Sequence, residues 1–187
     1  EQVVPAAVPG VVHVDLLRAG LLEDMNWRDN ERKQQWIAET DWLYSREFKV
    51  DEDFFSCQNI LLRCEGLDTL ADVLVNGQKL MHADNMFRTW EVDVKEHLHV
   101  GVNRLEVHFY SPVPYMAERQ KERSLPCWNS YDPRYRGKSW LRKMPCSFGW
   151  DWGLMAVTCG IWRDISLIGV QRARISDVAF TQKHAGG

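Results

Sequence analysis

Apolar and polar residues alternate along most of the chain, and a period of two is typical of half-buried β-strands. In residues 42–50 one face of the expected strand carries the following side chains: Trp42, Tyr44, Arg46, Phe48 and Val50. The same alternation predicts strands over residues 60–65, 71–75, 78–80, 90–94, 105–109, 160–170 and 174–180. Many short strands with little helix predict an all-β fold, an antiparallel β-sandwich of jelly-roll type.

Turn and helix signals are compatible with this prediction. Asn76-Gly77 stands between two apolar strands and predicts a hairpin, because a type I′ turn needs positive φ at both central residues. Only two short helices are expected. One covers residues 31–37 and would be capped by Asn30, and the other covers residues 115–123.

Length and composition narrow the class of protein. A chain of 187 residues is too short for a complete (β/α)₈ barrel, which needs about 250 residues. No apolar run approaches the roughly 18 residues of a membrane span, so we expect no membrane partner. The five cysteines are odd in number and include no C-x-x-C pair. We therefore expect neither a disulfide framework nor a metal site, and no cofactor motif is present.

The chain begins with Glu and shows no signal peptide, so we expect a cut terminus and leave the location open between cytoplasm and periplasm.

One long segment breaks the strand pattern. Residues 117–143 contain eight Lys or Arg residues against three acidic ones, with aromatic residues among them. Such a segment could bind single-stranded nucleic acid. The chain as a whole has a net charge of −3 and no nucleic-acid-binding module, so we expect no nucleic-acid partner and interpret the segment as a functional or domain-contact loop.

A second stretch carries candidate chemistry. In Phe148-Gly149-Trp150-Asp151-Trp152-Gly153, two tryptophans flank one aspartate between glycines. A carboxylate can accept hydrogen bonds from sugar hydroxyls, and an indole can cover the apolar face of a pyranose ring. The same spacing also fits a bend whose tryptophans pack in the core. Three other tryptophans fall in strand patterns and are expected in the core: Trp42, Trp90 and Trp162.

The sequence resembles the N-terminal sugar-binding domain of glycoside hydrolase family 2, and its β-mannosidase branch in particular. The resemblance runs through residues 8–16, 42–48, 65–73, 75–77, 85–88, 142–153 and 160–165. Gly160-Ile161-Trp162-Arg163-Asp164 is shared widely in the family, whereas Phe148-Gly149-Trp150-Asp151-Trp152-Gly153 looks specific to the mannosidase branch.

The resemblance implies a galactose-binding-domain-like jelly roll in a parent enzyme that is a retaining exo-glycosidase removing terminal β-linked mannose. Such enzymes use two carboxylates about 5 to 5.5 Å apart. Both would lie on a barrel that follows immunoglobulin-like domains, so no residue of this chain is expected to be catalytic. The expected partners are terminal β-linked mannose and the missing domains of the same chain.

The resemblance also implies the substrate-binding residues. Asp151 matches the sugar-contacting aspartate, with Trp150 and Trp152 as its neighbours; Asn30 and Asn85 are weaker candidates, for which backbone capping is the alternative. Arg46 is expected to pair with a buried acid, either Asp164 or Asp72, because an unpaired buried charge is costly.

We expect the sugar-binding domain to cover residues 1–170 without the first edge strand that family members carry before Val8. Residues 171–187 would be a linker and the start of an immunoglobulin-like domain. Two alternatives stay open. The chain could be a stand-alone carbohydrate-binding module, or a purely structural domain of a family 2 β-galactosidase or β-glucuronidase.

Overall fold

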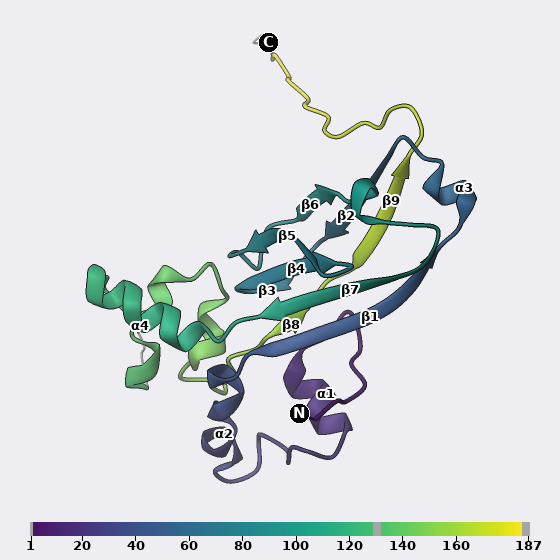
Figure 1. Ribbon diagram of the computed structural model, residues 1–187. Helices are drawn as coiled ribbons and strands as arrows, with labels where there is room; N and C mark the ends of the chain where they lie inside the picture. The colour runs from purple at the N-terminus through teal and green to yellow at the C-terminus, as the bar shows by residue number, and fades with distance from the viewer. Residues whose placement is uncertain (1, 129–131, 185–187) are drawn as a thin grey trace.

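The computed structural model describes residues 2–128 and 132–184, and most of its regular structure is antiparallel β-sheet (Figure 1). One sheet has the strand order β1-β7-β4-β5, a second has the order β6-β2-β9, and β3 pairs with β8. The strands are β1 (Trp42–Val50), β2 (Asn59–Cys64), β3 (Leu67–Asp68), β4 (Ala71–Val75), β5 (Gln78–Ala83), β6 (Trp90–Asp93), β7 (Gly101–Phe109), β8 (Gly160–Ile161) and β9 (Ile165–Val170).

The two larger sheets share one hydrophobic core. Ile60, Leu62 and Cys64 alternate along β2 and are buried, as the period of two predicts. They belong to the same buried cluster as Val73 of β4 and Val107 of β7, which come from the other sheet. Both larger sheets therefore contribute buried side chains to one core.

The predicted hairpin between β4 and β5 is confirmed. Asn76 and Gly77 have φ values of 50° and 80°, the left-handed conformation that this dipeptide supplies. The Asn76 amide also donates hydrogen bonds to the His97 carbonyl and to Asn103 Oδ1, each at 2.8 Å. These bonds join the turn to β7 and to the segment before it.

The helices are short, and the sequence signals missed two of the four α-helices in the described ranges, those over residues 12–18 and 52–55. The α-helices are α1 (Val12–Arg18), α2 (Asn30–Lys33), α3 (Glu52–Phe55) and α4 (Pro112–Glu122). The 3₁₀ segments are η1 (Gln35–Glu39), η2 (Lys95–His97), η3 (Pro133–Tyr135), η4 (Lys138–Trp140) and η5 (Pro145–Phe148). None of the helices in the described ranges has the length and apolar character that a membrane crossing requires.

The helix expected over residues 31–37 is divided into α2 and η1, and Asn30 is its first residue rather than its cap. The Asn30 side-chain amide instead donates to the Asp24 carbonyl at 2.9 Å. Helix α4 begins three residues earlier than predicted, because the Ser111 side chain caps it and Pro112 occupies its first turn.

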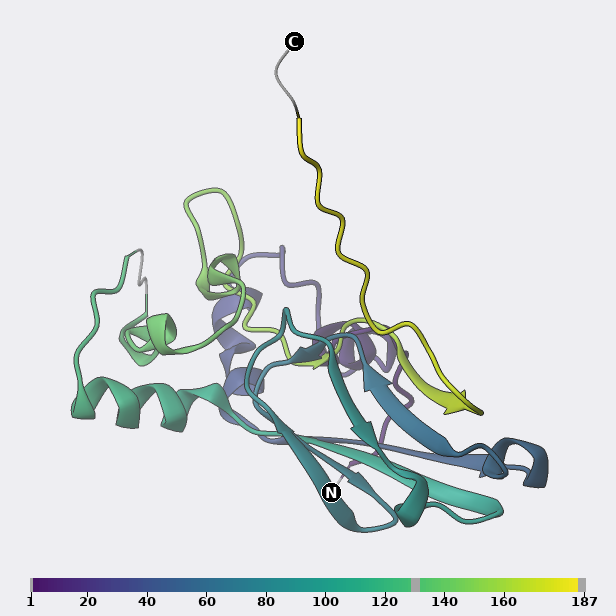
Figure 2. The same cartoon turned by 90° about the horizontal axis from the view of Figure 1, so that it is seen from above.

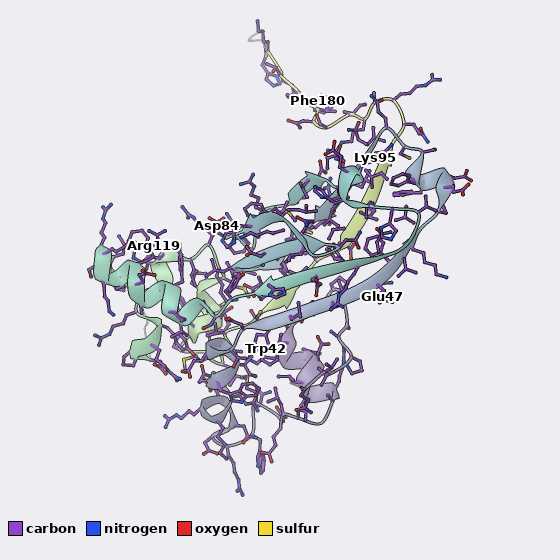
Figure 3. All side chains as sticks on the ribbon, viewed as in Figure 1. Trp42, Glu47, Asp84, Lys95, Arg119 and Phe180 are labelled. Atoms are coloured by element: carbon purple, nitrogen blue, oxygen red, sulfur yellow. The ribbon has the colours of Figure 1, made fainter. Side chains whose placement is uncertain are left out.

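Three predictions from the alternation are wrong. Residues 160–170 form two strands, β8 and β9, separated by an irregular stretch. Residues 174–180 form no strand: their apolar side chains are exposed, and the segment extends away from the sheets (Figures 1 and 2; Phe180 in Figure 3). Arg46 is exposed because β1 is an edge strand whose middle faces solvent, so its charge stays in water. Asp72 is bound instead by Lys79, His82 and Tyr110.

The segment that joins β7 to β8 leaves the sheets and has its own core. Figures 1 and 2 show α4 and the loops after it gathered at one end of the molecule, opposite α3. Met116 of α4 packs there with Tyr135, Phe148 and Val157 in a second buried cluster. This excursion contains both the basic segment and the candidate sugar-binding stretch.

A buried carboxylate joins the two ends of the loop over residues 143–158, the last part of this segment. Asp68, at the end of β3, is 1% exposed and accepts hydrogen bonds from Lys143 Nζ at 2.5 Å on each oxygen. The Thr158 hydroxyl donates to the same carboxylate at 2.7 Å, and Lys143 also donates to the Thr158 carbonyl at 2.9 Å. Lys143 and Thr158 are the two ends of a loop of the chain, and one carboxylate holds both.

His13 lies close to this ion pair. Burial of the ring and the nearby Lys143 charge lower the pKa of His13 from 6.5 to about 4, although Asp68 acts in the opposite direction. The His13 Nδ1 atom is buried and has no hydrogen-bond partner in the described part of the chain. The imidazole is therefore neutral near pH 7, and acid would place a second cation beside Lys143.

We expect Lys143→Met to lower the free energy of unfolding by about 3–5 kcal/mol, because Asp68 would keep a buried charge without its cation. The measurement is urea denaturation followed by circular dichroism. Lys79→Met is the matched control: Lys79 Nζ lies 2.7 Å from Asp72, but its side chain is half exposed, so the expected cost is below about 1 kcal/mol. Equal costs for the two variants would contradict a special contribution from the buried pair.

His13 predicts a specific acid sensitivity. Its folded-state pKa of about 4 lies below the unfolded value of 6.5, so the unfolded chain binds more protons between these pH values. The contribution of the neutral His13 ring to the free energy of unfolding is therefore fully present above pH 6.5. It is lost as the pH falls toward 4, by up to about 3 kcal/mol. In denaturation at a series of pH values, the free energy of unfolding of His13→Gln should change little between pH 6.5 and 4. His184→Gln, in the exposed tail, should keep the wild-type profile; a wild-type profile for His13→Gln would disprove the assignment.

Candidate functional site

Residues 150–153 form a tight turn at the far end of the loop that Asp68 closes. The Trp150 N–H donates to the Gly153 carbonyl at 3.2 Å, and the Gly153 N–H donates to the Trp150 carbonyl at 3.3 Å. These two bonds make a β-bridge and leave Asp151 and Trp152 at the tip. The sequence Trp-Asp-Trp-Gly is thus presented on a closed hairpin, the tip hairpin (residues 150–153).

The tryptophans of the tip hairpin face solvent. Trp152 is 75% exposed and Trp150 is 37% exposed, with ring centroids 6.3 Å apart and planes inclined by 44°. The interpretation in which both rings pack in the core is therefore wrong. Asp151 is exposed between them, and within the described ranges no hydrogen bond or ion pair engages its carboxylate. Both carboxylate oxygens are open to a hydrogen-bond donor from outside.

The backbone before the turn sets its direction. The 3₁₀ segment η5 ends at Phe148, which is buried in the second core, and Gly149 follows with φ 90° and ψ 150°. This region of φ/ψ space is essentially restricted to glycine. A residue with a Cβ would strain the backbone at the point where the chain leaves the core for the tip hairpin.

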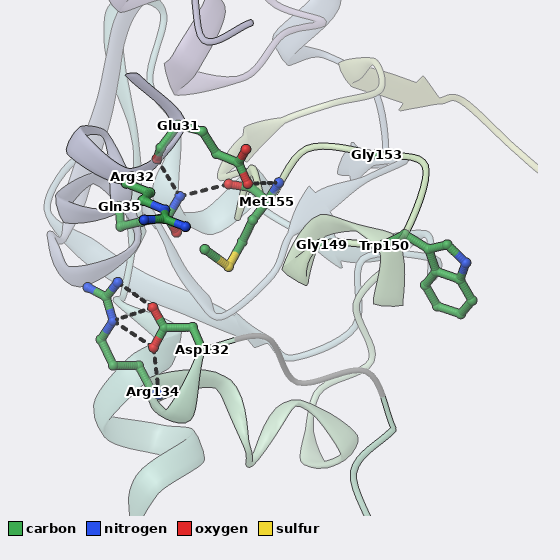
Figure 4. A pocket seen from close by; sticks show the side chains of 9 residues that line it. All are labelled: Glu31, Arg32, Gln35, Asp132, Arg134, Gly149, Trp150, Gly153 and Met155. Carbon is green, nitrogen blue, oxygen red and sulfur yellow. Dashed lines mark hydrogen bonds and ion pairs between the residues drawn. The ribbon is translucent and has the colours of Figure 1, made fainter. Parts of the chain in front are cut away.

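An open hollow of about 500 Å³ lies beside the tip hairpin. Its lining comes from α2 and η1, from η3 and the residue before it, and from both sides of the hairpin: Glu31, Arg32, Gln35, Asp132, Arg134, Gly149, Trp150, Gly153 and Met155 (Figure 4). In that view the Trp150 indole points away from the polar side chains of the hollow. The hollow is polar, and the aromatic surface lies at its edge.

Arg134 and its ion-pair partner Asp132 form one wall of the hollow. Arg134 Nε lies 3.0 Å from both Asp132 oxygens, and its guanidinium also pairs with Glu39. The Arg134 guanidinium holds the pKa of the Asp132 carboxyl below its usual value. This wall is therefore a charged and internally paired cluster at neutral pH.

Two side chains hold the return limb of the tip hairpin. The Glu31 carboxylate accepts from the Met155 N–H at 2.7 Å, and the Gln35 amide donates to the Met155 carbonyl at 2.8 Å. Sequence reasoning did not identify Glu31 or Gln35. Their spacing of four places them on one side of a helical turn, but nothing local indicates a partner about 120 residues away.

The structure gives the two candidate asparagines local contacts. Asn30 is buried and its amide bonds to the Asp24 carbonyl. The Asn85 side-chain oxygen accepts from the Phe87 N–H at 2.9 Å, a turn-stabilising contact, and the Asn85 backbone bridges to Arg142. The side chains that the structure brings together at the hairpin are Trp150, Asp151 and Trp152.

This arrangement can bind a polyol through one exposed carboxylate and two flat apolar surfaces. All five cysteines are free, and no group of three or more His, Cys, Asp or Glu residues in the described ranges could hold a metal ion. The Asp151 carboxylate of the tip hairpin offers hydrogen-bond acceptance, and its two indoles offer ring contact.

The fold and the tip hairpin together define an antiparallel β-domain with an exposed aromatic loop. The family described as "Glycosyl hydrolase 2 galactose-binding domain-like" matches residues 1–163. The chain belongs to this family, as the resemblance of its motifs predicts.

Similar proteins include enzymes named as β-mannosidases. The goat (Capra hircus) β-mannosidase is 38% identical over 183 residues, which are 95% of this chain and 21% of that protein. The β-mannosidase B of Emericella nidulans is 35% identical over 178 residues, again 95% of this chain and 21% of its own length. The crystal structure of the β-D-mannosidase from Dictyoglomus thermophilum matches with a TM-score of 0.84 and 40% identity, over 92% of this chain and 21% of that one. The chain thus spans about a fifth of the length of these relatives.

We expect Gly149→Ala to lower the free energy of unfolding by about 1–3 kcal/mol, because alanine is strained at φ 90° and ψ 150°. Chemical denaturation measures the change. Gly153→Ala is the matched control: it is also in the tip hairpin, and an added Cβ there would meet nothing within 4 Å. Equal losses for the two variants would show that the conformation of Gly149 does not fix the hairpin.

Proposed function

We propose that the chain is the sugar-binding domain of a retaining exo-β-mannosidase-like glycoside hydrolase, and that its tip hairpin contributes to the subsite for the terminal sugar. In this proposal the catalytic carboxylates lie elsewhere in the parent enzyme. The observation that carries the proposal is the exposed Asp151 carboxylate between two exposed indoles on a closed turn. The names of the relatives support mannose as the sugar.

The chemistry of the hairpin suits a pyranoside. The Asp151 carboxylate can accept hydrogen bonds from two hydroxyls of the same ring. A hydrogen bond to a charged group contributes more than a neutral one, which suits recognition of hydroxyl positions. We assign Trp150 as the wall beside the sugar, with Trp152 as its neighbour. Binding energy collected here, away from the broken bond, can orient the substrate for the chemistry.

We further infer that the two larger sheets are the layers of a jelly-roll β-sandwich, since their buried residues form one cluster. The sugar-binding domain would cover residues 1–170, because β9 ends at Val170 and residues 171–184 after it are exposed. Residues 171–187 would be a linker and the start of an immunoglobulin-like domain. The partners would be terminal β-linked mannose and the other domains of the parent chain.

Asp151→Ala in the full-length enzyme tests the proposal. We expect kcat/KM for a chromogenic β-mannoside to fall by about 5- to 150-fold, which corresponds to about 1–3 kcal/mol, because the sugar hydroxyls lose their acceptor. Glu52→Ala is the control: this exposed carboxylate lies on α3, at the opposite end of the molecule, and its loss should leave kcat/KM unchanged (Figure 1).

The competing functions give different results. A purely structural domain predicts that Asp151→Ala leaves kcat/KM unchanged in an enzyme that is still folded. A domain of a β-galactosidase or β-glucuronidase predicts that the full-length enzyme prefers those substrates to the β-mannoside. A stand-alone binding module predicts that the isolated chain binds a mannoside without the rest of the enzyme.

A further inference from the structure

We propose that Glu31 and Gln35 are positioning residues, which hold the tip hairpin at the angle from which Asp151 meets the sugar. This inference rests on the proposed function and adds to it two residues whose side chains bond to the backbone of the loop that carries the hairpin. They act through the backbone of Met155, two residues beyond the turn.

Side chains hold both backbone groups of Met155. Its N–H donates to the Glu31 carboxylate at 2.7 Å, and its carbonyl accepts from the Gln35 amide at 2.8 Å. Both backbone groups of one loop residue are thus satisfied by side chains from one short helical region, as Figure 4 shows. A β-strand neighbour would satisfy a residue in the same way, but here side chains replace the strand.

The Gln35 side chain is itself held in one orientation. It is 4% exposed, and its amide nitrogen also donates to the Glu31 carbonyl at 2.7 Å. Its side-chain oxygen accepts from the Tyr135 hydroxyl at 2.8 Å, and Tyr135 is fully buried in the second core. The orientation of the Gln35 amide is therefore fixed at both ends, and through it the hairpin is joined to a packed region.

Other contacts also hold the tip hairpin. Phe148 and Val157 are buried on the two sides of the loop, and the hydrogen bonds between Trp150 and Gly153 close the turn on itself. Those contacts lie at the base of the loop and within the turn itself. The bonds from Glu31 and Gln35 to Met155 join the return limb to α2 and η1, and we infer that they oppose a tilt of the turn about its base. Small misplacement of a substrate-orienting group, of about 1 Å, can cost up to about 100-fold in rate.

The test compares Glu31→Leu with Glu31→Gln in the full-length enzyme. Leucine cannot accept from the Met155 N–H, so we expect kcat/KM for a β-mannoside to fall by about tenfold. Glutamine keeps an oxygen acceptor at the same place, so Glu31→Gln should stay within about twofold of the wild type. A tenfold loss in both variants would overturn the proposal, because it would point to the charge rather than to the bond. The absence of any loss in Glu31→Leu would also overturn it.

A double-mutant cycle separates positioning from general damage. If Glu31 acts through the tip hairpin, Glu31→Leu should change kcat/KM by less than about twofold when Asp151 is already Ala. If the two losses multiply, Glu31 acts elsewhere and the inference fails. Should Glu31→Leu not fold, Tyr135→Phe replaces it in the cycle, since it removes only the hydroxyl that holds Gln35.

The same cycle tells the two proposals apart. An unchanged kcat/KM in Asp151→Ala alone defeats the proposed function, and with it the inference. A reduced kcat/KM in Asp151→Ala, together with multiplying losses, leaves the proposed function standing and defeats the positioning of the hairpin by Glu31 and Gln35.

Discussion

The Asp68 carboxylate is the point on which the functional end of this domain depends. It is buried, and it holds Lys143 and Thr158, which begin and end the loop that carries the tip hairpin. A buried carboxylate needs both a cation and hydrogen-bond donors to offset its desolvation. Because one loop end supplies the cation and the other a hydroxyl, satisfying the charge also closes the loop. Asp68 itself is fixed by the pairing of β3 with β8, so the sheets determine where the loop starts.

Beyond the contacts of Asp68, the loop is held by a few specific contacts instead of by pairing between strands. Phe148 anchors it in the second core, Gly149 redirects the backbone, and Met155 is held by Glu31 and Gln35. Loops on a rigid scaffold are the usual place for binding residues, since their sequence can vary without loss of the core. Here the two ends of the loop and the return limb are fixed, so the exposed residues between them are presented in a defined geometry.

Sequence patterns predicted the parts of the fold that depend on neighbours in the chain. The strand over residues 42–50 and the Asn76-Gly77 hairpin follow from local periodicity and local φ requirements, and both are confirmed. Contacts between distant residues leave no such pattern, so neither the Asp68–Lys143 pair nor the Glu31–Met155 bond could be foreseen. The Arg46 prediction failed for a related reason. Alternation identifies a face of a strand, but only the strand order shows that β1 lies at an edge.

The tip hairpin shows why residue type alone could not separate core from surface. Tryptophan suits a buried core as well as a binding surface, and glycines flank it in bends of both kinds. The structure distinguishes the two, because Trp152 is largely exposed while the bonds around Met155 and Asp68 keep its loop ordered. Leaving large apolar area in water opposes folding. Contacts that hold such area in place stabilise the fold little through the exposed rings themselves. Under the proposed function, these contacts would instead serve to present the rings and Asp151 to the sugar.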